Sequence, residues 1–64
     1  MQHKLYAMRK AKNLTQEEMA NVLNVSTVTY RAKEKSKIPF NADEMFMIAS
    51  YFNTDMNDIF IPRA

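Results

Sequence analysis

Residues 14–34, LTQEEMANVLNVSTVTYRAKE, decide the fold of this chain because they contain the start and stop signals of two short helices. Thr15 lies three residues before Glu18, which is the spacing of a capping box at a helix N-terminus. Ser26 is a second N-cap residue, and the helix that it begins continues to about Lys35. The apolar stripe of the first of these helices comprises Met19, Ala20 and Leu23. The stretch therefore predicts two helices joined by a tight turn.

The rest of the chain predicts three further helices. A first helix is expected over about residues 2–12, a fourth over about residues 42–52, and a short fifth after Asp55. Asn41 and Asp55 are placed as N-caps of the last two, each with an acidic residue three positions further on. The residues expected to face the core are Leu5, Met8, Val25, Met45, Ile48, Ala49, Phe52, Ile59 and Phe60. No useful stretch alternates with period two, so we predict an all-α fold.

Asparagine takes the place of glycine at the predicted helix ends. The chain has no glycine, yet helix C-termini often need a residue in the left-handed region, where asparagine is the next best choice. Asn13, Asn24 and Asn53 each follow a predicted helix. We interpret them as left-handed helix stops; the alternative is that they are ordinary surface asparagines.

Composition limits the classes of protein that the chain can belong to. Residues 1–64 are enough for one domain. There is no cysteine, and the lone His3 cannot build a zinc site, so no metal or cofactor is expected. No nucleophile–base pair or phosphate-cradling loop is present, which argues against an enzyme. No apolar run approaches the roughly 20 residues that span a membrane, so a cytoplasmic protein without a membrane partner is expected.

Charge is distributed unevenly along the chain. Residues 1–37 carry eight lysine and arginine residues against three glutamates, whereas residues 38–64 carry Arg63 against four acidic residues. A basic half suggests a surface for a polyanion, and the acidic half suggests a second surface for something else. The alternative is a set of solvated faces on a small helical protein.

Several segments together resemble the XRE family of helix-turn-helix regulators, which includes phage Cro and the DNA-binding domains of lambdoid repressors. The segments that carry the resemblance are Leu5 and Arg9, Leu14 to Ala20 leading to Leu23, Val25-Ser26, Glu34, and Met56 to Phe60. Tyr30 to Phe40 is also similar to small phage and prophage regulators of Gram-positive bacteria. The resemblance implies a five-helix lambda-repressor-like domain with the helix-turn-helix at helices 2 and 3. It also implies a sequence-specific transcriptional regulator that binds operator double-stranded DNA.

Three positions depart from the family pattern. Asn24 replaces the usual turn glycine, and Ser36 replaces the glycine after the third helix; both residues are compatible with turns. Lys33 stands where relatives more often carry a large apolar residue. We expect its methylene stem to cover apolar surface while the ammonium group stays in water, available to a phosphate.

The resemblance assigns base reading to the exposed face of the third helix. The residues carried over to this role are Thr27, Val28, Arg31 and Ala32. Val28 could contact thymine methyl groups or instead face the core, and Arg31 could hold a guanine or a phosphate. Tyr30 is expected in the core. Because only Arg31 is a strong base-reading side chain, part of the specificity is expected from DNA shape.

Four residues are expected to anchor the DNA backbone: Gln16, Lys35, Lys37 and Asn41. Capping alone would also explain Asn41. Arg9 and Glu34 are expected to form a structural ion pair between the first and third helices, as in the family.

A second surface is expected on the fourth helix and the tail. Met47, Tyr51 and Ile61 are the candidate homodimer surface, Phe40 adds apolar area without obvious cover, and Phe46 could belong to the core. A monomer whose tail covers this surface is the alternative. The rival function is a protein-interaction module, antitoxin-like or adaptor, on the same fold. No small-molecule ligand is expected in either case.

Overall fold

The chain folds into five helices, seen in a computed structural model that describes residues 1–61. In chain order they are α1 (His3–Ala11), α2 (Gln16–Leu23), α3 (Thr27–Glu34), α4 (Ala42–Tyr51) and α5 (Met56–Ile59). Residues 62–64, and with them Arg63, lie outside the described part. Within residues 1–61 there is no strand, so the predicted all-α class and the five helices are confirmed.

Four of these helices, α2 to α5, begin directly after the N-cap residues predicted from the sequence. The Thr15 hydroxyl accepts a hydrogen bond from the Glu18 amide at 3.0 Å, and the Glu18 carboxylate accepts one from the Thr15 amide at 3.0 Å. Asn41 and Glu44 form the same reciprocal pair, at 2.7 and 3.0 Å. The Ser26 hydroxyl accepts from the backbone amide of the third residue of α3 at 3.1 Å. These local bonds fix where α2, α3 and α4 start.

The cap of α5 differs from the prediction. The Asp55 carboxylate accepts from the amide of Asn57 at 2.8 Å, and Asp58 takes no part in a capping box. The Asp58 amide instead bonds the Asp55 carbonyl at 3.0 Å. The Asp58 amide is thus already bonded within the first turn of this four-residue helix, and the Asp55 carboxylate caps the amide of Asn57.

The chain reverses at non-glycine residues in left-handed backbone conformation. Asn13, Asn24 and Asn53 have φ angles of 56°, 59° and 55°, which confirms their interpretation as helix stops. Ser36 has a φ of 65°, so the residue that replaces the family's glycine adopts the conformation that the turn requires.

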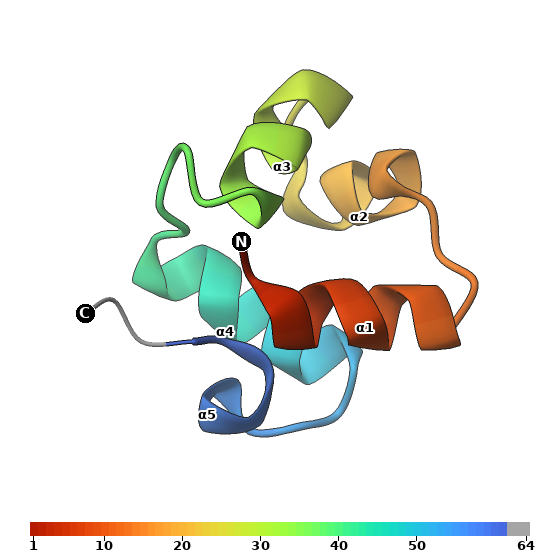
Figure 1. Ribbon diagram of the computed structural model, residues 1–64, viewed down its shortest axis with the longest axis vertical. Coiled ribbons are helices and arrows are strands. Elements are labelled where there is room, and N and C mark those ends of the chain that lie inside the picture. The colour runs from red at the N-terminus through yellow and green to blue at the C-terminus, as the bar shows by residue number, and fades with distance from the viewer. Residues whose placement is uncertain (62–64) are drawn as a thin grey trace.

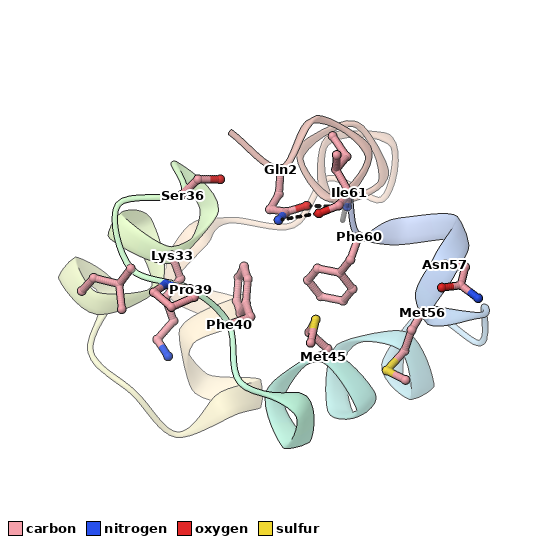
Figure 2. Close-up of a pocket in the computed structure, with 11 residues that line it drawn as sticks. Gln2, Lys33, Ser36, Pro39, Phe40, Met45, Met56, Asn57, Phe60 and Ile61 are labelled. Carbon is pink, nitrogen blue, oxygen red and sulfur yellow. Dashed lines mark hydrogen bonds between the residues drawn. The ribbon is translucent and has the colours of Figure 1, made fainter. Parts of the chain in front are cut away.

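The core is shared by all five helices and contains three rings in contact. Among its fully buried side chains are Leu5, Met19, Tyr30, Ile48 and Ile59. Phe40 lies 6.1 Å from the Tyr30 ring and 5.2 Å from the Phe60 ring, in edge-to-face geometry between centroids. Figure 2 shows the rings of Phe40 and Phe60 next to each other.

The structure corrects the predicted position of Phe40 and decides that of Phe46, which the sequence left open between core and surface. Phe40 is only 9% exposed, because the segment before α4 turns its ring into the gap between Tyr30 and Phe60. Phe46 is 64% exposed, because the helical phase that buries Ile48 and Ala49 turns the residue two positions before Ile48 outward. Phe40 therefore belongs to the core and Phe46 to the surface.

The helix-turn-helix pair α2 and α3 lies at one end of the molecule, above the other three helices (Figure 1). α2 and α3 lie together at the top of Figure 1, with α1 crossing below them and α4 and α5 on the other side of the core. The outer face of α3 therefore points away from the rest of the molecule. Within residues 1–61 no helix is long and apolar enough to span a membrane.

We predict that the turn between α2 and α3 depends on the left-handed tolerance of Asn24. Asn24→Ala should lower the free energy of unfolding by about 1 kcal/mol, because an alanine Cβ is disfavoured in that region, and urea unfolding would measure it. Asn21→Ala on the exposed face of α2 is the matched control. It should leave stability unchanged or slightly higher through helix propensity. Equal losses in both variants would contradict the turn argument.

Candidate nucleic-acid interface

The exposed surface of α3 contains the residues expected to read bases. Val28 is 72% exposed, so the alternative that it faces the core is wrong. Arg31 is exposed one turn further on, and Thr27 and Ala32 are half-buried beside them. The opposite face of α3 carries the fully buried Tyr30. The four residues thus share one side of a helix that is docked by its other side.

The carboxylate of Glu34, at the end of α3, accepts four hydrogen bonds. Arg9 donates two of them, Nε to Oε2 at 2.9 Å and Nη2 to Oε1 at 3.1 Å. The Tyr30 hydroxyl donates to Oε2 at 2.8 Å, and the Gln16 amide nitrogen donates to Oε1 at 3.2 Å. Four acceptances are about the full capacity of an ionised carboxylate. The ion pair between Arg9 and Glu34 is therefore present as the centre of a larger network.

This network connects three helices. Arg9 lies on α1, Gln16 begins α2, and Tyr30 and Glu34 lie on α3. Arg9 also donates its Nη1 to the Leu14 carbonyl at 2.8 Å, so the loop before α2 is attached to the same guanidinium. The relative positions of α2 and α3 are thus set by directional bonds as well as by apolar packing.

The protonation states in the network are fixed by burial and by the bonds themselves. Burial would raise the pKa of Glu34, but hydrogen bonds from Arg9, Tyr30 and Gln16 outweigh it and the pKa is lowered. Burial and the bond to Glu34 raise the pKa of Tyr30, so its hydroxyl keeps the proton that it donates. The bond to Glu34 also raises the pKa of Arg9. A charged carboxylate and a charged guanidinium are the stable forms at neutral pH.

The side chain of Gln16 is engaged within the protein. Its amide nitrogen bonds Glu34, and its carbonyl oxygen accepts from Arg31 Nε at 3.3 Å. The expectation that this side-chain amide is available to a phosphate is thus not supported by its geometry. The backbone of α2 at this position still lies at a helix N-terminus, where amide groups favour an anion.

The Lys33 side chain points into the protein and forms an ion pair there, so the expectation that its ammonium group stays in water is wrong. Its Nζ lies 2.6 Å from Glu44 Oε1, and both side chains are only 11% exposed. The ammonium also lies 5.9 Å from the centre of the Phe40 ring. Burial opposes the charge on Glu44, but the bond from Lys33 and the Asn41 amide lower the pKa of that carboxyl. Lys33 therefore connects α3 to α4 and is withdrawn from the basic surface.

The remaining anchoring candidates lie at the C-terminal end of α3 and beyond it. Lys35 is the C-cap residue of α3, Lys37 follows the turn at Ser36, and both are exposed. Asn41 is exposed as well, and its side-chain oxygen caps α4. This capping role is enough to explain an asparagine at position 41, whether or not it also contacts a phosphate. The structure brings the two lysines to the end of the helix that carries Val28 and Arg31.

The candidate dimer residues do not line a common hollow. Tyr51 lines a shallow hollow together with Lys12, whereas Ile61 lines a separate groove of about 320 Å³. Figure 2 shows this groove, where the backbone of Ile61 exchanges hydrogen bonds with the Gln2 side chain. Met47 and Tyr51 are exposed on α4 together with Phe46. The exposed apolar residues of α4 thus form one surface, whereas Ile61, the third predicted residue, lies at a different groove.

Two capped helices in this arrangement, the second with an outward polar and apolar face, define a helix-turn-helix domain. The Helix-turn-helix family profile matches residues 5–59. An uncharacterized HTH-type transcriptional regulator of Methanocaldococcus jannaschii is 43% identical over 61 residues, which is 95% of this chain and 92% of that protein. The chain belongs to the XRE family of helix-turn-helix transcriptional regulators, a non-enzymatic class of DNA-binding proteins.

We predict that the Arg9–Glu34 pair is required for the fold. Arg9→Met should lower the free energy of unfolding by about 3–5 kcal/mol, because it leaves a buried carboxylate without its cationic partner. Urea unfolding at neutral pH, followed by circular dichroism, would measure the loss. Lys4→Met removes the same charge from an exposed position on α1 and should cost less than about 0.5 kcal/mol. Similar losses in the two variants would show that only net charge matters.

Proposed function

We propose that this protein is a sequence-specific regulator that places α3 in the major groove of operator DNA and blocks transcription. The observation that carries this proposal is the α3 surface: Thr27, Val28 and Arg31 lie on one outward side of a helix that is held rigidly from behind. The sequence resemblance further supports a small phage or prophage regulator of the Cro type.

The proposed readout combines one polar, one apolar and one cationic contact. Thr27 can exchange a hydrogen bond with a base edge, and Val28 can contact thymine methyl groups. Arg31 can form a bidentate contact to guanine. Ala32 permits close approach because its side chain is a single methyl group. Sequence-dependent DNA shape supplies the remaining specificity.

The proposed anchoring combines exposed lysine charges with helix N-termini. Lys35 and Lys37 are exposed and can each neutralise a phosphate, while the N-terminus of α2 at Gln16 presents backbone amides to another. Asn41 can add a contact through its exposed side-chain nitrogen. These contacts set affinity and register and carry no sequence information.

We also propose that the protein binds DNA as a homodimer. The support is the exposed apolar surface on α4, where Phe46, Met47 and Tyr51 lie within two turns of one another. A two-fold dimer would set two α3 helices about 34 Å apart, one turn of DNA. The same surface would serve a protein-interaction module, which is the rival function. The two functions differ in whether any duplex is bound in a salt-dependent manner.

We predict that the two exposed lysines supply affinity and not sequence preference. Replacing Lys35 and Lys37 together with alanine should weaken binding to every duplex and reduce the slope of log affinity against log salt by about 1.8 for each chain bound, and so by about 3.6 for a dimer. Binding titrations at several salt concentrations would measure both effects. The double variant of Lys4 and Lys12 to alanine removes the same charge from α1 and its C-cap and should leave the slope nearly unchanged. An unchanged slope in the first variant would contradict the docking geometry.

We further predict that selection from a random pool of duplexes will return a preferred site with two-fold symmetry. The symmetry follows because two identical recognition helices read two equivalent half-sites. Sequencing of the bound pool would identify the site, and sedimentation would give the stoichiometry of the complex. An asymmetric site bound by one chain would exclude the dimer, and the absence of any salt-sensitive enrichment would favour the protein-interaction module.

A further inference from the structure

The Gln16 side chain bridges the buried network to the reading surface. Its amide nitrogen lies 3.2 Å from Glu34 Oε1, and its carbonyl oxygen lies 3.3 Å from Arg31 Nε. Gln16 is half-buried, whereas Arg31 is exposed on α3. The amide thus connects the saturated carboxylate inside the protein to the single arginine on the outward face.

The chemistry of the two partners fixes the orientation of this amide. An ionised carboxylate only accepts hydrogen bonds, so Glu34 must face the NH₂ group of Gln16. A guanidinium only donates, so Arg31 must face the carbonyl oxygen. Both contacts exist in one orientation and neither survives rotation of the amide by 180°. Glu34 is itself held by Arg9 and Tyr30, so the carbonyl oxygen is presented at a fixed position.

The contact at Nε determines which part of the guanidinium remains for a ligand. An arginine can approach an acceptor pair side-on, through Nε and one terminal nitrogen, or end-on, through Nη1 and Nη2. With Nε bonded to Gln16, the side-on edge is occupied and the end-on edge of Arg31 is left. The O6 and N7 acceptors of guanine match such a pair of donors.

We propose that Gln16 is a positioning residue for base recognition, which holds Arg31 by Nε so that its end-on edge reads a guanine. This inference rests on the proposed DNA-binding function and assigns the side chain of Gln16 a role other than phosphate contact. Restraint of a long side chain before binding reduces the conformational entropy lost in the complex. The restraint acts on the guanine contact and not on phosphate contacts made elsewhere.

The test compares Gln16→Met with wild type on duplexes that differ at one base pair. Methionine has nearly the same length and helix propensity but cannot make either hydrogen bond. The relevant base pair is the one at which Arg31→Ala abolishes a preference for guanine in the selected site. Gln16→Met should reduce that preference by about fivefold to tenfold, a large part of what a bidentate contact contributes, while the salt slope stays unchanged.

A double variant separates positioning from a general structural effect. If Gln16 acts through Arg31, adding Gln16→Met to Arg31→Ala should cause no further loss of guanine preference. Asn21→Ala, on an exposed position of the same helix, should leave the preference as in wild type. Circular dichroism would check that each variant is folded, and Gln16→Asn, one methylene shorter, provides a second version of the test if the methionine variant is not.

The outcomes distinguish this inference from the function on which it rests. Equal weakening on all duplexes by Gln16→Met, with the guanine preference intact, would overturn positioning and identify a contact to the DNA backbone. An additive loss in the double variant would overturn it as well. Absence of any salt-sensitive duplex binding by the wild-type protein would instead overturn the proposed function itself.

Discussion

The geometry of this domain depends on one buried carboxylate that must be fully hydrogen-bonded. Glu34 is only 1% exposed, and an unpaired charge at such depth would be strongly destabilising. Its four donors come from three helices, so the carboxylate is satisfied only when α1, α2 and α3 are correctly placed. A hydrophobic contact at this point would tolerate small shifts between α2 and α3, whereas directional bonds do not. The charge is thus a constraint on helix orientation more than a source of stability.

A second buried pair acts on the same recognition helix from another direction. Lys33 bonds Glu44, whose carboxylate also completes the capping box of α4. The two pairs use an arginine and a lysine from the basic half of the chain, leaving Arg31, Lys35 and Lys37 as the exposed cations of α3 and its end. The uneven charge in the sequence therefore overstates the basic surface, because part of that charge is neutralised inside the fold.

Local signals in the sequence were sufficient for the helices, whereas the Arg9–Glu34 pair was implied only by the resemblance to the family. Caps at Thr15, Ser26 and Asn41 and left-handed asparagines act within a few residues, so spacing alone reveals them. Phe40 was not placed correctly because it lies between helices, where no periodicity indicates which side faces inward. The bond of Gln16 to Arg31 joins residues 15 apart through the turn, and no pattern in the sequence encodes which side chains meet there.

The outward face of α3 shows how a small domain can combine affinity with selectivity. Valine and threonine are β-branched, so in a helix Val28 keeps nearly one side-chain conformation and Thr27 is limited to about two, and both lose little entropy on binding. Arg31 is the flexible exception, and it is the residue that the buried network reaches through Gln16. Within residues 1–61, no contact of this kind holds Lys35 or Lys37, which suits contacts to phosphates whose exact positions matter less. In the proposed complex, side chains that must meet a particular base are rigid or held, and those that need only find a charge remain free.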